Sequence, residues 1–217
     1  MKIAVLGTGT VGNTIGSRLI ELGHAVMMGS RTADNEKVKA FVDKHGRYAS
    51  AGTFPDAAAL SDIIFNCTAG VASIEALTMA GGNNMNGKII VDLANPLDFS
   101  HGAPPSLSVV NTGSLGEEIQ KAFPQSKVVK TLNTMWCGIM VNPALVNNGD
   151  HNVFLCSNYE DAKEEVRKIL LSFGWKVENI IDLGDLTAAR GTEMFLPLWL
   201  KLYATKKGSA FNIKVVD

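Results

Sequence analysis

A chain of 217 residues that is 46% hydrophobic and 19% charged has the composition of an ordinary globular protein with one sizeable core. Its formal net charge of -1 excludes the basic surfaces that nucleic acids or anionic membranes require. No apolar run approaches the roughly 18 residues of a membrane span, and a predicted strand begins at the first residues, where a signal peptide would stand. We therefore expect a cytoplasmic protein that binds neither nucleic acid nor a membrane.

The cysteines also indicate a cytoplasmic protein. Cys67, Cys137 and Cys156 lie far apart in the sequence, are odd in number and lack the spacing of metal ligands. Separated thiols of this kind are typical of buried free cysteines in a reducing compartment. The sequence therefore predicts neither a disulfide nor a metal site.

The first thirty residues are predicted to form a strand, a glycine turn, a helix and a second strand. Residues 2–6 are an apolar run that ends in glycine, as expected for a buried parallel strand. Residues 12–22 carry apolar side chains at helical spacing, with Gly23 just past the end. Residues 25–28 form the second apolar strand.

This alternation continues along the chain. Helices are predicted over 35–44, 54–60, 71–79, 114–123 and 160–173, and strands over 48–51, 62–67, 88–93, 127–132, 152–156 and 176–183. Strands that alternate with helices at this spacing indicate an α/β fold with a doubly wound, mostly parallel sheet of about eight strands.

Residues 186–217 are predicted to be a C-terminal helix and tail. Residues 186–206 have a helical pattern that Pro197 must kink or split, and residues 211–216 resemble a strand or a strand-like tail. Since no linker separates this part, we expect one domain over residues 1–217 with a small helical extension. The helix has more apolar surface than one face needs, which favours a homodimer; the apolar residues crowded around Pro197 are Leu196, Leu198, Trp199, Leu200 and Leu202.

The turn after the first strand carries the most informative motif. It matches the pattern G-x-G-x-x-G between a strand and a helix, and its residues are Gly7, Thr8, Gly9, Thr10, Val11 and Gly12. Gly7 allows the tight turn, Gly9 lets the backbone approach a pyrophosphate, and Gly12 lets the helix pack closely on the strand. The free amides and the dipole of the helix start then face the anion. The motif predicts a Rossmann dinucleotide-binding unit.

The residues after the second strand distinguish the two nicotinamide cofactors. NAD-binding units place a carboxylate there for the ribose hydroxyls, whereas this chain has Ser30, Arg31 and Thr32. A carboxylate would repel a 2′-phosphate, and a guanidinium would hold it through charge-assisted hydrogen bonds of about 1.5–3 kcal/mol. We therefore predict NADP(H).

Two further residues are candidate contacts of the same cofactor. Thr8 lies in the turn, and Lys37 lies in the next predicted helix, where a solvated lysine is an equally good interpretation. Asp34 comes a few residues too late to bind the ribose and is interpreted as a helix N-cap.

Four segments carry a resemblance to known proteins: residues 6–12, 29–31, 127–134 and the helix that begins at residue 196. On these segments and on its length, the chain resembles the NADP oxidoreductases that depend on coenzyme F-420, a 5-deazaflavin. It also resembles the NADPH-binding domain of the six-transmembrane ferric reductases. The resemblance implies a homodimer that transfers a hydride between NADPH and a deazaflavin or flavin-type partner. At residues 133–136 the chain departs from the His-Thr-Ile-Pro-like segment of the family.

Open α/β sheets bind ligands beyond the carboxyl ends of their strands, so three loops are expected to form the substrate cleft: residues 67–70, 94–97 and 133–135. In this fold the loop after the fourth strand lies beside the nicotinamide ribose. Thr68 and Ala69 are therefore predicted contacts of the cofactor.

Two asparagines in these loops have alternative interpretations. Asn95, which precedes a proline, either meets the cofactor carboxamide or closes the turn. Asn133, like Thr134 after it, either hydrogen-bonds the ligands in the cleft or forms a turn. Met135 and Trp136 are apolar candidates for the wall of a planar-ring pocket.

No acid–base pair stands out, and no catalytic residue is assigned. Direct hydride transfer to a flavin-like ring depends on stacking and distance more than on proton transfer. Of the histidines, only His101 lies near a predicted cleft loop; His24 is assigned to a turn, and His45 and His151 to loops. Two alternatives stay open: a reductase of a small carbonyl or imine compound, which needs a proton donor, and an NADPH-sensing module without catalysis.

Overall fold

The computed structural model describes residues 1–216. Its main-sheet strands are β1 (Lys2–Leu6), β2 (Ala25–Ser30), β3 (Ala49–Thr53), β4 (Ile63–Asn66), β5 (Ile89–Asp92), β8 (Lys127–Thr131), β9 (Val153–Cys156) and β10 (Ile180–Asp182). They form one sheet in the order β10-β9-β8-β5-β4-β1-β2-β3. All neighbours are parallel except β8 and β9, which are antiparallel. The predicted doubly wound, mostly parallel sheet is confirmed.

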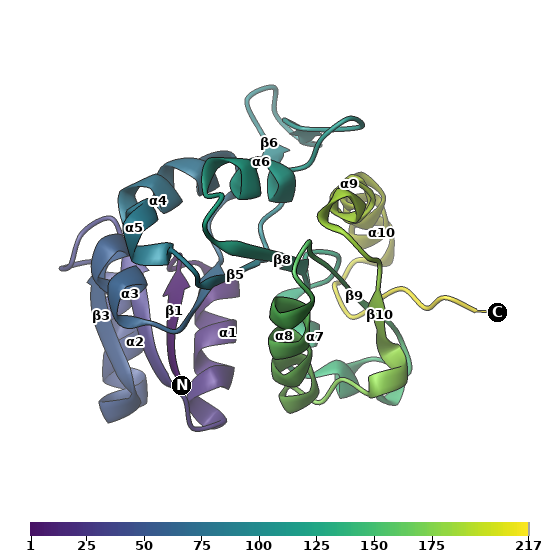
Figure 1. The fold of residues 1–217 in the computed structure, drawn as a ribbon. Helices are drawn as coiled ribbons and strands as arrows, with labels where there is room; N and C mark the ends of the chain where they lie inside the picture. Colours follow the sequence, from purple (N-terminus) through teal and green to yellow (C-terminus); the bar gives the residue numbers. More distant parts are fainter. Residues whose placement is uncertain (217) are drawn as a thin grey trace.

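Helices cover both faces of the sheet (Figure 1). One face packs against α1 (Thr10–Glu21), α2 (Glu36–His45), α7 (Cys137–Val141) and α8 (Glu160–Ser172). The other face packs against α3 (Phe54–Leu60), α4 (Ser73–Ala80), α5 (Gly82–Met85), α6 (Leu115–Ala122) and the start of α9 (Ala189–Met194). The two cores follow from strand alternation, because Ile3 and Val5 face one layer and Ala4 and Leu6 the other. The sheet is therefore buried on both sides, as its apolar strands predicted.

The C-terminal part confirms the predicted break and differs elsewhere. The helical stretch is split at Phe195 into α9 and α10 (Leu196–Lys206), and Pro197 lies in the first turn of α10, where a helix does not need its missing amide. The expected strand 176–183 is a 3-10 turn (Val177–Asn179) followed by the short β10. Residues 209–216 are an extended tail, outside any described strand, that pairs with Asn152.

Several local assignments need correction. Asn35 and not Asp34 caps α2, because its side-chain oxygen accepts from the amide of Lys37 at 2.9 Å. His45 ends α2 and hydrogen-bonds Ser17, so it does not lie on a loop. His151 lies on the loop before β9, as predicted, and is buried at 2% exposure between Pro143 and Asn212. The cap is a local contact one residue from the predicted one, whereas His45 is positioned by Ser17, 28 residues away in the sequence.

A small hairpin was not predicted. It consists of β6 (Leu97–Asp98) and β7 (Ser106–Leu107) and protrudes beyond the carboxyl ends of the central strands (Figure 1). No helix within residues 1–216 is long and apolar enough to cross a bilayer. All three cysteines are free; Cys137 and Cys156 are buried, and Cys67 is half-buried.

Candidate dinucleotide and hydride-transfer site

The turn after β1 owes its shape to two glycines. Gly7 has a φ of 117°, a backbone conformation that residues with a Cβ rarely adopt. A Cβ on Gly7 would lie 2.5 Å from the Cys67 carbonyl oxygen, and a Cβ on Gly12 would lie 2.0 Å from the Gly7 carbonyl oxygen. The turn is therefore packed against the loop after β4 on one side and against the start of α1 on the other.

Gly9 faces open space instead. It is the N-cap residue of α1, and no described atom lies within 4 Å of a Cβ built on it. The first turn of α1 has no acidic side chain, so its free amides and dipole are available to an anion. The Asn13 side chain donates to the carbonyl oxygens of Thr8 and Gly9 at 3.0 and 3.2 Å and braces the turn. This geometry fits a pyrophosphate.

The end of β2 lies beside this turn, because the Gly7 amide donates to the Gly29 carbonyl oxygen at 3.2 Å. Ser30 is buried, and its hydroxyl donates to the Thr32 carbonyl oxygen. The remaining predicted 2′-phosphate contacts are exposed at this edge: Arg31, Thr32 and Lys37. Two cationic side chains and a hydroxyl are thus exposed in the segment that follows β2.

A cleft of about 480 Å³ opens at the carboxyl ends of β1, β4 and β5. Its walls are Val11, residues 67–71, residues 93–95 and residues 97–100 of the hairpin. Thr68, Ala69 and Asn95 therefore line it, as predicted, whereas His101 is not among its lining residues. Larger hollows of about 530 and 650 Å³ lie along α1 and at the amino ends of β1 and β2, away from the strand ends where such sheets bind ligands.

The cleft loops are fixed to one another. A Cβ on Gly70 would lie 1.9 Å from the Asn95 carbonyl oxygen, so the loops after β4 and β5 are in backbone contact. Asn95 donates to the Asn133 carbonyl oxygen at 2.8 Å, and Asn133 donates to the Asn95 side-chain oxygen at 2.9 Å. Leu132 adopts a φ of 63°, a strained conformation for a branched side chain, at the bend that brings Asn133 back. Neither interpretation of Asn95 included this reciprocal pair.

Other predicted residues lie at the margins. The Thr68 hydroxyl donates to the Asn66 side-chain oxygen at 2.7 Å, so its proton already has a partner within the chain. Thr134 is buried and lines a separate apolar cavity of about 250 Å³. Met135 is buried, and Trp136 is 39% exposed at the start of α7. Neither Met135 nor Trp136 is among the residues that line the cleft.

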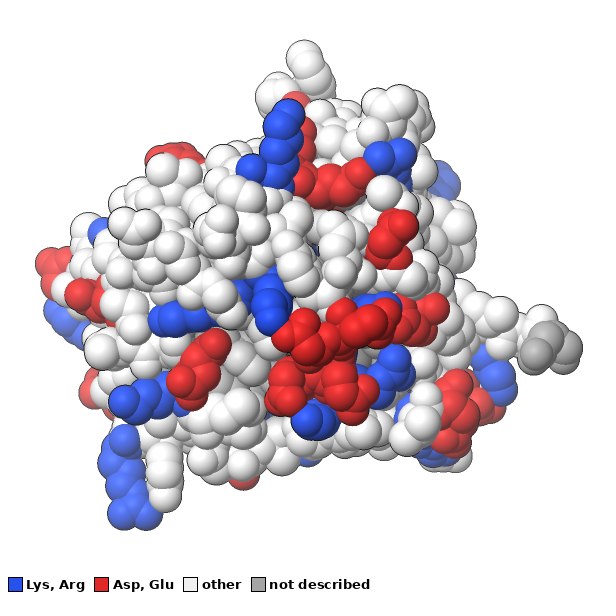
Figure 2. Space-filling model, in the orientation of Figure 1, with Lys and Arg blue, Asp and Glu red and all other residues white. Residues whose placement is uncertain are grey.

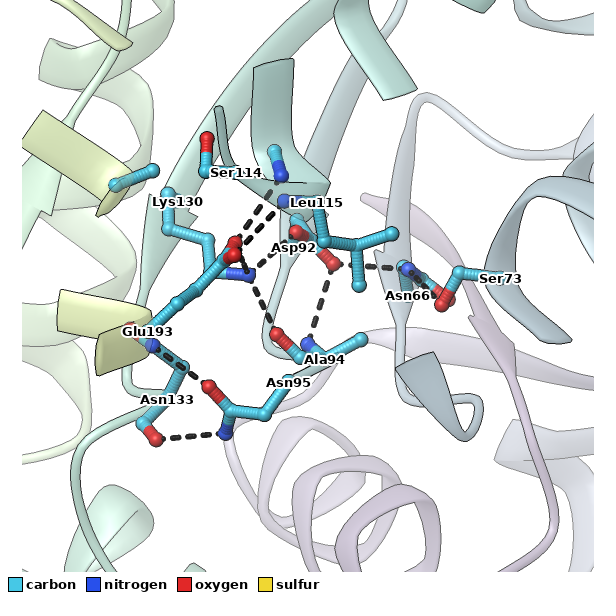
Figure 3. A network of polar contacts seen from close by, with 12 residues as sticks. Asn66, Ser73, Asp92, Ala94, Asn95, Ser114, Leu115, Lys130, Asn133 and Glu193 are labelled. Atoms are coloured by element: carbon cyan, nitrogen blue, oxygen red, sulfur yellow. Dashed lines mark hydrogen bonds and ion pairs between the residues drawn. The ribbon is translucent and has the colours of Figure 1, made fainter. Parts of the chain in front are cut away.

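Beneath the cleft lies a buried ionic network that the sequence analysis missed (Figure 3). The Lys130 ammonium contacts Asp92 Oδ2 at 2.8 Å and Glu193 Oε1 at 2.7 Å, and it donates to the Ala94 carbonyl oxygen. All three charged side chains are at most 1% exposed. A charged residue inside the apolar strand 127–132 was the available indication, since buried charges require partners.

The environment of this network shifts two pKa values upward. Burial disfavours the Lys130 ammonium, but the carboxylates of Asp92 and Glu193 outweigh it and raise the pKa of Lys130. Burial raises the pKa of Glu193, and the Lys130 charge only partly offsets this effect. The lysine therefore stays protonated and serves as a structural cation, not as a proton donor.

Charges on the surface are mixed. Figure 2 shows acidic and basic side chains side by side, with acidic ones gathered over α8. There Lys163 contacts Glu160 and Asp182, and Lys168 contacts Glu165. This face offers no extended basic patch.

Comparison with known proteins gives the family. Residues 2–96 match the family model described as NADP oxidoreductase, coenzyme F-420-dependent. A crystal structure from Arthrobacter sp. FB24, provisionally named as an F-420-dependent NADP reductase, is 49% identical, with full coverage of both chains and a TM-score of 0.95. The chain belongs to this family. It is thus an NADP-dependent oxidoreductase by family, and the predicted resemblance and enzyme class are confirmed.

More distant relatives share parts of this architecture. Metalloreductase STEAP3 of Rattus norvegicus is 26% identical over 215 residues, which cover 91% of this chain and 38% of that protein. The chain thus spans well under half the length of this curated relative. A reductive aminase from Aspergillus terreus, solved with NADPH, is 16% identical with a TM-score of 0.64 and covers 95% of this chain and 62% of its own. This likeness concerns the fold alone.

Proposed function

We propose that the chain transfers a hydride between NADPH and a deazaflavin or flavin-type partner in the cleft at the carboxyl ends of β1, β4 and β5. The observation that carries the proposal is the chemistry of the cleft lining. Its only ionisable side chains among the described residues are Cys67 and Asp98. Burial raises the pKa of the Cys67 thiol, and hydrogen bonds from Ser100 lower the pKa of Asp98. At neutral pH, Cys67 is a very weak acid and Asp98 is already deprotonated.

This lining suits a reaction that needs no side-chain proton donor. Reduction of a carbonyl or imine compound requires a proton at the reacting atom, whereas a hydride passes directly between two planar rings held in contact. The proton that completes reduction of a deazaflavin can come from solvent, so NADPH, the oxidised partner and one proton give NADP⁺ and the reduced partner.

Three groups of residues would hold the successive parts of NADPH. The turn over residues 7–12 would bind the pyrophosphate, and Ser30, Arg31, Thr32 and Lys37 the 2′-phosphate. Thr68 and Ala69, with the Asn95–Asn133 pair, would bound the nicotinamide half. Bound NADPH supplies the hydride; the chain orients the ring and shields it.

Apolar side chains at the mouth of the cleft suit a second planar ring. Val71 and Phe99 line the cleft yet are 62% and 59% exposed. A ring that covers this surface removes it from water, which stabilises the complex by about 25 cal/mol per Å² of apolar area buried. Phe99 lies at the end of β6 on the protruding hairpin, opposite the loop after β4. We therefore place the acceptor between these two walls.

The test is anaerobic oxidation of NADPH by the purified protein, with oxidised coenzyme F-420 in one series and free FMN in a second. We expect turnover with the deazaflavin, and a Gly9→Ala variant serves as a matched control that binds NADPH more weakly but keeps its fold. Tight NADPH binding without turnover of either ring would overturn the proposal and direct the search to carbonyl or imine substrates or to an NADPH sensor.

We propose that the protein works in the reducing cytoplasm, where its thiols stay free. We also propose that the chain forms a homodimer through α10. Leu198 and Tyr203 on this helix are 55% and 47% exposed, and Trp199 stacks on Tyr203 and Phe211 with ring centroids 5.5 Å apart. Burial of this surface in a second copy would remove the apolar exposure. Light scattering after gel filtration at micromolar concentration tests it, with a dimer mass expected and a monomer mass contradicting the proposal.

A further inference from the structure

Lys130 joins three segments of the chain at a single buried atom. Its Nζ contacts Asp92 at the end of β5, Glu193 on α9 and the Ala94 carbonyl oxygen in a cleft loop (Figure 3). An ammonium taken out of water is costly unless its donors are satisfied, and these three acceptors match its three protons. Any displacement of one acceptor therefore acts on the other two.

The first connection from Lys130 leads to the loop after β4. The other oxygen of Asp92, Oδ1, accepts from Asn66 Nδ2 at 2.8 Å and from the Ala94 amide at 3.2 Å. Asn66 in turn accepts the Thr68 hydroxyl at 2.7 Å and the Thr68 amide at 3.3 Å. Thr68 lines the cleft, so two buried side chains separate it from the lysine.

The second connection leads to the loop after β5. Ala94, whose carbonyl oxygen accepts from Lys130, precedes Asn95. Asn95 is paired with Asn133 and lies in backbone contact with Gly70. Both loops that would bound the nicotinamide half are thus anchored to the same ammonium.

Glu193 forms the far end of this network and lines no part of the cleft. Its Oε2 accepts from the Leu115 amide at 2.7 Å and its Oε1 from the Gly116 amide at 3.1 Å, at the start of α6. Two carboxylates share one ammonium, and the amide donors at the helix start offset the surplus negative charge. Glu193 therefore fixes the position of the lysine from the side opposite the cleft.

We propose that Glu193 is a positioning residue for hydride transfer: acting through Lys130, it fixes the two loops that bound the nicotinamide half. The C-terminal helix α9 thereby sets the geometry of a site that it does not touch. This inference rests on the proposed function, and it concerns the hydride step and the nicotinamide half, not the phosphate turn.

The test variant is Glu193→Gln, which keeps the size of the side chain and removes its charge. The amide would turn a donor toward Leu115, Gly116 or the ammonium, so the lysine must shift toward Asp92. A displacement of about 1 Å at a reacting centre can cost about 100-fold in rate. We expect the single-turnover rate of hydride transfer to fall about 10- to 100-fold, with an unchanged Kd for 2′,5′-ADP, which reports the adenine half alone.

Arg190→Gln is the matched control. Arg190 lies on the same helix α9 and contacts Glu117 of the same α6, with Nε donating to Oε2 at 2.9 Å, but it has no bond to Lys130 or to the cleft loops. This variant removes one contact between α9 and α6 and leaves the three contacts of the ammonium in place. We expect its melting temperature to fall while its hydride-transfer rate stays within about twofold of the unaltered protein.

A second readout does not depend on turnover. The fluorescence yield of bound NADPH reports the surroundings of the nicotinamide ring, and we expect it to change in Glu193→Gln but not in Arg190→Gln. An unchanged rate and yield in Glu193→Gln, or an equal loss in both variants, would overturn the positioning role. If the unaltered protein binds NADPH but fails to reduce a deazaflavin, the proposed function fails, and the fluorescence comparison still decides this inference.

Discussion

Exchanging glycine for alanine at two positions of the phosphate turn should separate binding from folding. Gly9 caps α1 with a φ of −77°, which alanine adopts readily, and its Cβ position is free of described atoms within 4 Å. Gly12 lies one turn later, where a Cβ would come within 2.0 Å of the Gly7 carbonyl oxygen. The two variants add the same methyl group, one into the space reserved for the cofactor and one into the packed backbone.

The expected magnitudes differ accordingly. Gly9→Ala lowers the conformational entropy of the unfolded chain, which stabilises the fold by about 0.4–1 kcal/mol. Alanine is also a poorer helix cap than glycine, which offsets this gain, so the melting temperature should shift by less than about 4 °C. The methyl group should hold the pyrophosphate off the helix amides, and one lost charge-assisted hydrogen bond of about 1.5–3 kcal/mol raises the Kd of NADPH about 10- to 150-fold. For Gly12→Ala, an overpacking cost of about 1–3 kcal/mol predicts a loss of about 2–12 °C.

Thermal unfolding and fluorescence titration with NADPH measure both quantities on the same samples. If Gly9→Ala bound NADPH as tightly as the unaltered protein, the open space at the start of α1 would not hold the pyrophosphate. Equal melting temperatures for all three proteins would contradict the packing argument for Gly12.

Three further predictions concern the cofactor edge, the acceptor wall and the C-terminal helix. Arg31→Ala should weaken NADPH binding about tenfold, since the side chain is exposed, and leave NADH nearly unchanged; equal losses in parallel titrations would exclude a 2′-phosphate role. Phe99→Ala should raise the KM for the flavin-type acceptor severalfold without altering the Kd of NADPH, and steady-state kinetics that show a loss in NADPH binding instead would contradict the assignment of the wall. Hydrogen bonds from Arg190 lower the pKa of Glu117, so this contact stabilises the fold above the ordinary glutamate pKa of about 4.3 and is lost as the pH falls through the lower folded value. The difference in melting temperature between the unaltered protein and Arg190→Gln should therefore be present at neutral pH and vanish in acid, whereas a constant difference would rule out the ion pair as its source.

The alternating elements could be predicted because each is determined by local pattern. Runs of three or four consecutive apolar residues marked the strands predicted over 2–6, 62–67 and 88–93, and a sheet buried on both faces requires such runs. Pro197 predicted the break between α9 and α10, because proline lacks the amide proton of a helix and clashes with the carbonyl group one turn earlier. The hairpin of β6 and β7 has two-residue strands, which are too short to show a period.

The C-terminal tail shows what local pattern could not predict. Residues 211–216 have strand-like composition, yet their position depends on hydrogen bonds to Asn152, about sixty residues earlier. Local pattern could therefore predict an extended conformation but not its partner.

The candidate site divides in the same way. The glycine turn and Arg31 lie within thirty-one residues of sequence, where motif spacing carries the geometry. The network of Asp92, Lys130 and Glu193 joins residues up to about a hundred positions apart, and only the packed fold brings them together. Lys130 could have been singled out as a charge inside an apolar strand, but its partners could not have been named.

Direct hydride transfer from NADPH to a planar-ring partner can be tested by an anaerobic single-turnover experiment with NADPH deuterated at the transferred position of C4. The protein is mixed with this NADPH and oxidised coenzyme F-420, and the product is analysed by mass spectrometry. We expect the deuterium to appear on the ring carbon of the reduced deazaflavin, with a slower rate than for unlabelled NADPH. NADPH that binds without losing its label to the deazaflavin would contradict it.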